Sequence, residues 1–282
     1  MKAVGYQAPL PIDDPNSLLD ITLPVPKPEP HDLLVHVKAV SVNPVDIKVR
    51  QRAKPEGADY KVLGWDVAGV VTQVGTDCVL FREGDEVFYA GSLVRQGANA
   101  EFHLVDERIV GHKPKSLDFA GAAALPLTTI TAWELLFDRF RIIPGKSGDA
   151  GRLLITGAAG GVGSILIQLA RRLTTLTVIA TASRETTKRW CIDLGAHHVI
   201  DHSHPLQPQL ERIGIPTVEY IASLNATDQH FPGLLTVLAP QGHFGLIDDP
   251  ATLDVLPLKQ KSACEDRERP LSRETGTGRI LS

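Results

Sequence analysis

A glycine-rich turn in the second half of the chain constrains its fold more than any other feature. Residues 156–163 read Thr-Gly-Ala-Ala-Gly-Gly-Val-Gly and follow the short apolar run Arg152–Thr156. Beyond the turn, apolar residues recur at the spacing of one helix face, at Val162, Ile165, Leu166, Leu169, Ala170 and Leu173. The pattern predicts a buried strand, a tight turn and an amphipathic helix, in that order.

A turn of this kind presents the start of its helix to a ligand. The first N–H groups of a helix have no intrahelical acceptor, and the helix dipole places about half a positive charge there. Glycines also let a diphosphate approach the backbone closely. We therefore predict that a dinucleotide binds this turn through Gly157, Ala158, Ala159, Gly160, Gly161, Val162 and Gly163. The alternative is an ordinary glycine-rich turn between a strand and a helix.

The residues after the next predicted strand indicate which dinucleotide binds. That strand covers Leu176–Ala182, and Ser183 and Arg184 follow it directly. NAD sites place a carboxylate here for the ribose 2′-hydroxyl, and this chain has none at that point. A hydroxyl and a guanidinium, with Lys188 one turn further on, suit a 2′-phosphate instead. We predict NADPH as the cofactor; the alternative is that Arg184 is a solvated residue at a helix start.

The order of the predicted elements indicates an α/β fold with two parts. Short strands separated by glycine turns dominate the first part, at Leu33–Val40, Val67–Val74 and Glu86–Ala90. From about residue 120 the pattern changes to a helix-compatible stretch and then to alternating strands and helices. This alternation is typical of a doubly wound parallel sheet.

Composition excludes several classes of partner. The formal net charge is -4, so we expect no attraction to nucleic acid or to an anionic membrane. No apolar run approaches the roughly 18 residues of a membrane span, and the N-terminus does not resemble a secretory signal. The 3 cysteines are far apart in the sequence, which argues against a disulfide framework. We expect a cytoplasmic protein whose partner is a small-molecule substrate.

Several short blocks, in order along the chain, carry a resemblance to a known superfamily. They are Ser41–Asp46 with Arg50, Gly64–Val71 with Gly75, Gly84–Val87, Leu125–Trp133, the glycine-rich turn, and Leu194–Ala196. Over roughly residues 1–260 the chain resembles the medium-chain dehydrogenases/reductases, in particular the zinc-free quinone oxidoreductase branch and its "zinc-type alcohol dehydrogenase-like" group. The resemblance implies a GroES-like substrate domain at residues 1–124 and a Rossmann NADPH-binding domain at residues 125–261.

The resemblance also implies a set of site residues. Zinc-dependent members have a cysteine where Asn43 stands and Gly-His-Glu where Gly64–Asp66 stands, so we expect no metal. By resemblance, the catalytic residues are Asn43 beside the nicotinamide and substrate, Asp46 in the same loop, and Thr131 at the nicotinamide ribose. Asp46 and Arg50 would brace the Asn43 loop; the alternative is that they form a structural ion pair.

The end of the sequence departs from the family pattern. Relatives continue into an edge strand that is used in dimer contact, and Leu258–Ser262 resembles its start. Residues 262–282 are charged and lack an apolar period, which predicts a disordered, atypical or truncated C-terminus. This departure puts the homodimer of the relatives in doubt for this chain.

The resemblance implies NADPH-dependent hydride transfer without zinc. Quinones and α,β-unsaturated carbonyl compounds are the expected acceptors, because they delocalise the charge that hydride addition creates and need less help from a Lewis acid. One alternative is a catalytically impaired, truncated chain that binds a nucleotide without turnover. Another is a zinc alcohol dehydrogenase.

Overall fold

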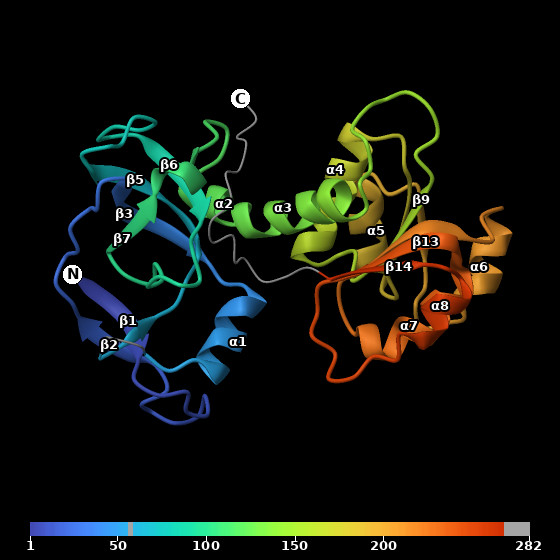
Figure 1. Cartoon of the computed structure of the whole chain (residues 1–282), viewed down its shortest axis with the longest axis horizontal. Coiled ribbons are helices and arrows are strands. Elements are labelled where there is room, and N and C mark those ends of the chain that lie inside the picture. Colours follow the sequence, from blue (N-terminus) through green and yellow to red (C-terminus); the bar gives the residue numbers. More distant parts are fainter. Residues whose placement is uncertain (56–58, 268–282) are drawn as a thin grey trace. The chain divides into compact units, whose positions relative to one another are not determined.

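The structure is a computed structural model, and it describes residues 1–55 and 59–267. Contacts divide the chain into two compact units, the first Met1–Leu127 and the second beginning at Thr128. Figure 1 shows the elements of each unit, and the two units are described separately below.

Two antiparallel sheets form the first unit. The larger has the order β7-β3-β5-β6-β8, with bounds Phe102–Asp106, Asp32–Ser41, Asp66–Val74, Glu86–Ala90 and Gly111–His112. The smaller has the order β2-β1-β4, with bounds Leu19–Thr22, Lys2–Tyr6 and Lys61–Val62. Alternate residues of the long strands, such as Leu33 and Val35 of β3, pack into one core. The three strands predicted in this part of the sequence are confirmed.

Short helices complete the first unit. α1 (Pro44–Arg52) begins with a proline at its first position, where the missing N–H group costs nothing. The others are a 3-10 turn, η1 (Glu107–Ile109), and α2 (Phe119–Ala123). α1 matters for the site, because the residue that precedes it is Asn43.

The second unit is a six-stranded parallel sheet with helices between its strands. The strand order is β11-β10-β9-β12-β13-β14, with bounds His198–Ile200, Thr177–Thr181, Arg152–Thr156, Val218–Ser223, Leu238–Leu246 and Cys264–Arg267. The intervening helices are α4 (Gly161–Leu173), α5 (Glu185–Asp193), α6 (Leu206–Arg212), α7 (Thr227–Val237) and α8 (Leu256–Gln260). This strand order is that of the Rossmann fold, so the predicted fold class is confirmed.

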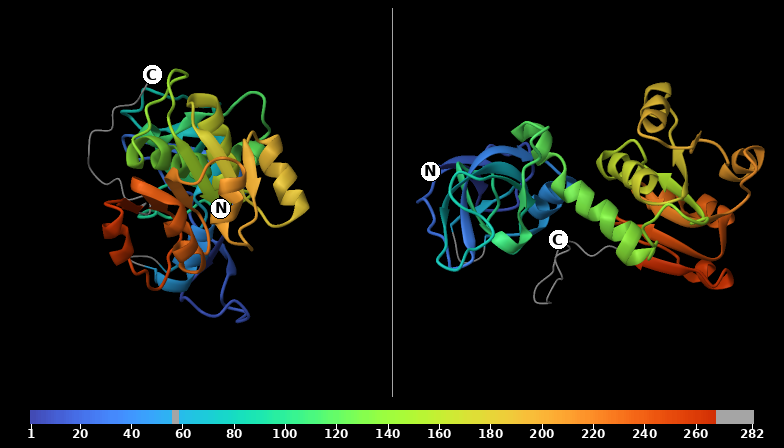
Figure 2. Two further views of the ribbon diagram at one scale, coloured as in Figure 1. Left: turned by 90° about the vertical axis from the view of Figure 1, so that its right-hand side faces the viewer. Right: turned by 90° about the horizontal axis from the view of Figure 1, so that it is seen from above.

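Helices cover both faces of the parallel sheet (Figure 2). Leu153 and Ile155 of β9 belong to a core that includes Leu166 of α4, whereas Leu154 belongs to a second core that includes Phe231 of α7. Successive side chains of a strand point to opposite faces, so an uninterrupted apolar run serves both layers. This explains why the sequence of β9 shows no polar alternation.

The predicted edge-strand start at Leu258–Ser262 is wrong. Leu256–Gln260 forms α8, because Leu258 is buried against the core of the second unit. The strand β14 follows at Cys264–Arg267 and pairs in parallel with β13, so the prediction of disorder from residue 262 is wrong for these four residues. Strand pairing uses backbone groups, which a charged sequence also carries. Residues 268–282 lie outside the described part of the chain.

Within the described residues, one stretch is long and apolar enough to cross a membrane. It is Phe119–Arg139, with 21 residues, which corrects the expectation that no apolar run reaches this length. The stretch consists of α2, α3 (Pro126–Trp133) and a π-helix, η2 (Glu134–Arg139). Ala122 and Leu135, near its two ends, are fully buried among protein side chains. A core helix meets the same length and composition test, so the stretch carries no membrane assignment.

Candidate functional site

The glycine-rich turn lies at the carboxyl edge of the parallel sheet, between β9 and α4. Gly157 has a φ of 67°, in the left-handed region that favours glycine. A Cβ atom on Gly163 would lie 2.5 Å from the carbonyl oxygen of Ala158, so the first turn of α4 packs directly on the backbone of the loop. These two glycines are therefore required by the path of the chain.

Two other glycines form the open side of the same turn. Gly160 and Gly161 are exposed. Among the described atoms, a Cβ on Gly160 would have one neighbour within 4 Å, the Gly157 carbonyl oxygen at 3.2 Å, and a Cβ on Gly161 would have Thr128 Cγ2 at 3.2 Å. Both glycines face solvent although a side chain on either would be tightly placed, and the first N–H groups of α4 have no acceptor within the helix. An anion such as a diphosphate fits a helix start of this form.

The residues predicted to select the cofactor lie beyond the end of β10. Ser183 and Arg184 are both exposed, and Arg184 is the N-cap residue of α5 but makes no capping bond with its side chain. Lys188 lies one turn further on, with its Nζ 3.9 Å from Oδ2 of Asp201 at the end of β11. Hydrogen bonds from Ser203 hold the pKa of Asp201 below its usual value, so the carboxylate that attracts Lys188 is ionised. Arg184 is therefore the cation better placed to meet a ligand from solvent.

A chain of hydroxyl groups joins the ends of three strands beside the turn. Thr156 of β9 donates to Ser223 of β12 over 3.3 Å, and the hydroxyl groups of Ser223 and Thr227 lie 2.7 Å apart. Thr227, the first residue of α7, also donates from its backbone N–H and its hydroxyl group to Asp248, which follows β13. Thr156, Ser223 and Thr227 are buried. These linked hydroxyl groups lie where the strand order of the sheet reverses, between β9 and β12. Ligands bind at this point in sheets of this type.

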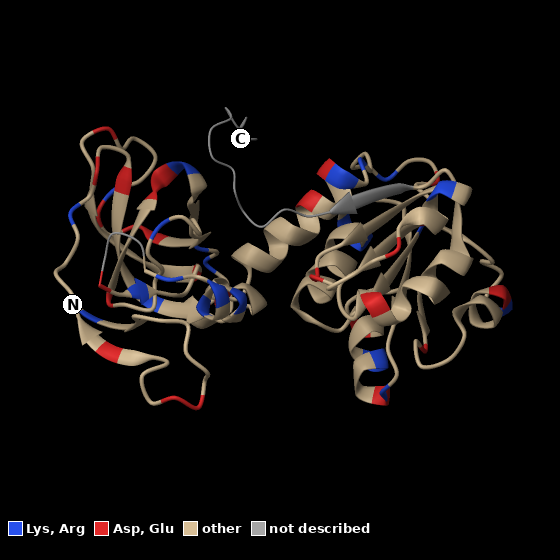
Figure 3. Cartoon of the chain, turned by 60° about the horizontal axis from the view of Figure 1, so that its bottom comes forward, with Lys and Arg blue, Asp and Glu red and all other residues tan. Residues whose placement is uncertain are grey.

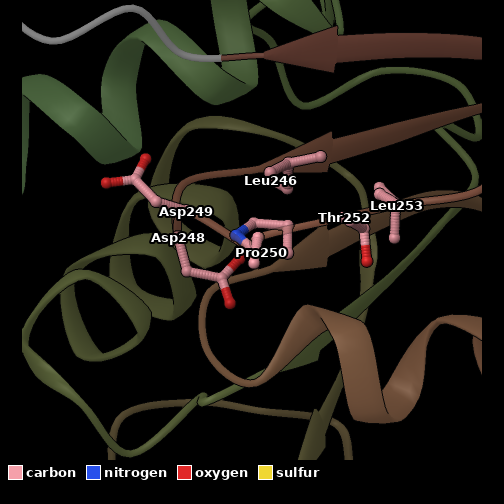
Figure 4. A pocket seen from close by; sticks show the side chains of 7 residues that line it. Leu246, Asp248, Asp249, Pro250, Thr252 and Leu253 are labelled. Atoms are coloured by element: carbon pink, nitrogen blue, oxygen red, sulfur yellow. The ribbon is translucent and has the colours of Figure 1, made fainter.

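The loop after β13 borders a hollow of about 360 Å³ at the same edge of the sheet. Its lining residues are Leu246, Asp248, Asp249, Pro250, Ala251, Thr252 and Leu253. In Figure 4 the carboxylates of Asp248 and Asp249 point in different directions. The Asp248 carboxylate is held by Thr227, so the hydroxyl chain fixes one side of this loop.

A polar cluster in the first unit contains two of the residues predicted to be catalytic. Asp46 accepts a hydrogen bond from the backbone N–H of Asn43 at 2.8 Å and another from the backbone N–H of Gly64 at 2.9 Å. Both Asn43 and Asp46 are buried. Asp46 therefore ties the start of α1 to the segment before β5, and burial raises the pKa of its carboxyl group.

Asp66 is the third member of this polar cluster, and sequence reasoning did not single it out. Its side chain is fully buried, and its Oδ2 accepts from Nδ2 of Asn43 at 3.1 Å. Its Oδ1 accepts from the backbone N–H of Leu127 at 3.0 Å. The pKa of Asp66 is raised to about 6, chiefly by burial and to a smaller extent by the charge of Asp46, while the hydrogen bonds from Leu127 and Asn43 oppose this increase.

The remaining predicted residues are placed as follows. Arg50 donates to the carbonyl oxygen of Leu10 at 2.8 Å, and the oxygens of Asp46 accept from backbone N–H groups, so the alternative of an Asp46–Arg50 ion pair is wrong.

Thr131 lies half-buried on α3 in the second unit. It follows Thr128 by three residues and so shares a helix face with the residue that adjoins Gly161.

The described side chains do not include a set of ligands arranged for a zinc ion. A catalytic zinc ion needs about three nitrogen, sulfur or oxygen ligands from the protein. Among the described side chains, those of residues 1–55 and 59–263, no group of three His, Cys, Asp or Glu is placed to hold a metal ion. Where zinc-dependent relatives have cysteine and histidine, this chain has Asn43 and Trp65, and the Trp65 side chain is buried in the core.

Comparison with known proteins agrees with the fold. Residues 29–124 match the alcohol dehydrogenase GroES-like domain. The chain is 39% identical over 275 residues to a zinc-type alcohol dehydrogenase-like protein of Staphylococcus epidermidis, covering 97% of this chain and 81% of that protein. The chain belongs to the medium-chain dehydrogenase/reductase superfamily. Its recognition from the sequence is thereby confirmed.

Two solved structures place the chain within this superfamily. A candidate zinc-dependent alcohol dehydrogenase of Rhizobium etli CFN 42 is 57% identical, with a TM-score of 0.92, and the match covers 97% of this chain and 80% of that one. A quinone oxidoreductase of Pseudomonas syringae pv. Tomato DC3000 is 26% identical, with a TM-score of 0.79, covering 95% and 81%. The chain is therefore an oxidoreductase of the medium-chain type.

Sequence reasoning missed the polar residues that end the parallel strands of this medium-chain dehydrogenase/reductase. Thr156 and Ser223 are the last residues of β9 and β12, and Asp248 follows β13 by two positions. Each stands where an apolar run changes to polar residues, and the carboxyl ends of parallel strands share one edge. That signal was available in the sequence. The partner of Asn43, by contrast, lies 23 positions away, and no motif predicts their contact.

Proposed function

We propose that this chain binds NADPH and transfers a hydride to a quinone or an α,β-unsaturated carbonyl compound without a metal ion. The observation that carries the proposal is the solvent-exposed glycine-rich turn at the start of α4, with the exposed Ser183 and Arg184 beyond the end of the neighbouring strand. The turn offers backbone N–H groups to a diphosphate. A guanidinium beside a hydroxyl group suits the additional 2′-phosphate of NADPH.

When bound, NADPH would supply a hydride from C4 of its nicotinamide. In the proposal, the turn and Thr131 hold the cofactor, and Asn43 orients the acceptor through its amide. An enone would accept the hydride at its β-carbon and give an enolate, and a quinone would accept it and give a hydroquinone anion. A proton from water completes either reduction, and the cofactor leaves as NADP⁺. The described residues offer no zinc site, so the proposed reaction assigns no step to a metal.

The proposed partners follow from the same chemistry. Figure 3 shows both signs of charge in each unit, which supports a small-molecule substrate rather than nucleic acid. We retain the cytoplasmic location expected from the sequence as part of the proposal.

The test is NADPH oxidation by the purified full chain, with a small para-quinone and an α,β-unsaturated ketone as acceptors and a chelator present. We expect saturable NADPH binding and loss of NADPH absorbance that depends on the acceptor and resists the chelator. Binding without turnover would favour the alternative of a catalytically impaired nucleotide-binding chain. Turnover that the chelator abolishes and zinc restores would refute the proposal in favour of a zinc alcohol dehydrogenase.

A further inference from the structure

Asp66 is placed to control the side chain of Asn43. The Asp66 carboxylate is fully buried at the start of β5, and one oxygen accepts from Nδ2 of Asn43 at 3.1 Å. Its other oxygen is occupied by the backbone N–H of Leu127 at 3.0 Å. With a partner on each oxygen, the carboxylate has a fixed plane, and its contact with Asn43 has a fixed direction.

An asparagine amide has two ends of similar shape and opposite hydrogen-bonding character. The nitrogen end donates two hydrogen bonds and the oxygen end accepts. Only the nitrogen end is attracted to an ionised carboxylate, because two oxygens would repel each other. The contact with Asp66 therefore decides which end of the Asn43 amide is engaged inside the protein and which end is left for other partners.

We propose that Asp66 is a positioning residue that holds the Asn43 amide in one orientation for the hydride-transfer reaction. The inference rests on the proposed function, since Asn43 is the group assigned there to the acceptor. Asp66 is not assigned to the acceptor itself, because its side chain is fully buried and both of its oxygens are occupied.

The hydrogen bond between Asn43 and Asp66 should depend on pH. Burial and the neighbouring charge of Asp46 on α1 raise the pKa of Asp66 to about 6. The paired strands present Ser41 and Ala90 opposite Asp66, α2 carries no titratable side chain, and α3 contributes the Leu127 N–H. Protonated Asp66 would place an O–H donor among groups that themselves donate. Its hold on Asn43 would therefore weaken as the pH falls below about 6.

The first test reads the coupling in the free protein, without cofactor or turnover. In a ¹⁵N-labelled sample, the side-chain amide signals of Asn43 are assigned by their loss in Asn43→Ala. We expect them to shift with pH in the wild type, with a midpoint near the pKa of about 6, and to show no such step in Asp66→Asn. The proposal would be overturned if the Asn43 amide signals of the wild type had the same chemical shifts at pH values below and above this midpoint.

The second test reads the consequence for the reaction through a double-mutant cycle. We expect Asp66→Asn to lower kcat by about tenfold, as for loss of a hydrogen bond to a charged group, with the Kd of NADPH within about twofold. In the Asn43→Ala background, Asp66→Asn should change kcat by less than about twofold. The wild-type kcat should fall as the pH drops below the midpoint of the Asp66 titration, and Asn43→Ala should abolish this fall. If both variants are folded and their effects on the free energy of activation are additive, the proposal is overturned.

A matched control separates positioning from general stability. Tyr89→Phe removes another buried polar contact of the first unit, the bond of 2.9 Å between the Tyr89 hydroxyl group and Nδ1 of His103. We expect it to lower Tm and leave the pH profile of kcat unchanged. A wild type that shows the pH-dependent Asn43 signals but reduces no quinone or enone would refute the proposed function and leave the Asp66–Asn43 coupling intact.

Discussion

The glycine-rich turn of the second unit and the polar cluster of the first unit present binding groups in opposite ways. The turn offers backbone N–H groups, and its form depends on residues that lack side chains, such as Gly157 and Gly163. The cluster of Asn43, Asp46 and Asp66 depends on buried side chains that bond one another or distant backbone groups. A backbone site should fail when atoms are added to it, whereas a side-chain site should fail when a charge or a hydrogen bond is changed.

The largest effect is expected from filling the turn. Gly163→Val would place a Cβ 2.5 Å from the Ala158 carbonyl oxygen, so α4 must move away from the loop. We expect the free energy of unfolding to fall by about 3 kcal/mol and the Kd of NADPH to rise by about a hundredfold. Chemical denaturation and a binding titration measure the two effects.

A matched glycine in the same unit provides the control. Gly233 lies inside α7, and apart from its chain neighbours and the backbone of its own helix no atom lies within 4 Å of where a Cβ would be. Gly233→Ala should leave NADPH binding unchanged and raise the free energy of unfolding by about 0.5 kcal/mol or more, because alanine favours helix. If Gly163→Val behaved like this control, the close packing of the turn would have no role in binding.

The polar cluster should instead respond to pH. The pKa of Asp66 is raised from 3.8 to about 6, so the ionised form is less favourable in the folded chain than in the unfolded chain. The corresponding stability is complete below the unfolded pKa and is lost as the pH rises through about 6, by about 3 kcal/mol at most. Asp66→Asn should remove this part of the pH dependence of unfolding. A variant with the same pH dependence as the wild type would show that Asp66 ionises normally.

Cofactor selection by the second unit should depend on one exposed cation. Arg184→Ala should raise the Kd of NADPH by about tenfold or more and leave the Kd of NADH within about twofold, since the lost bond is to the 2′-phosphate. Arg189→Ala, at another exposed position of α5, is the matched control and should change neither constant. Equal weakening of both dinucleotides by Arg184→Ala would contradict the role assigned to this residue.

A smaller effect is expected from cutting the hydroxyl chain. Thr227→Val keeps the shape of the side chain but leaves Ser223 and Asp248 without a shared partner. We expect a loss of about 1 to 2 kcal/mol in stability and a modest rise in the Kd of NADPH, about threefold. Thr227→Ser retains the hydroxyl group and should show less than half of either effect. If Thr227→Val left the Kd of NADPH unchanged, the linked hydroxyl groups of Thr156, Ser223 and Thr227 would have only a structural role.

The same contrast explains what the sequence could predict. The strand, turn and helix around Gly157–Gly163 follow from local spacing, and the parallel sheet follows from the alternation of the later strands with helices. Local spacing also gave the bounds of β6 and β9 to the residue. Short-range sequence patterns therefore predict most of the fold of the second unit.

Long-range contacts account for what the sequence did not reveal. Asp66 meets Leu127 across 61 positions, and Thr156 meets Ser223 across 67 positions. The error at residues 264–267 has a related cause, since β14 forms by pairing its backbone with β13 and not through an apolar pattern. The role of Arg50 was also misjudged as a possible ion pair, because its partner is a backbone carbonyl of a distant loop.

The most direct measurement is a pair of binding titrations on the full chain, with NADPH and NADH compared in the same buffer. If the turn holds a diphosphate and Arg184 meets the 2′-phosphate, both dinucleotides should bind saturably and NADPH should bind at least about tenfold more tightly. Saturable binding by neither dinucleotide, or equal Kd values for the two, would contradict this account.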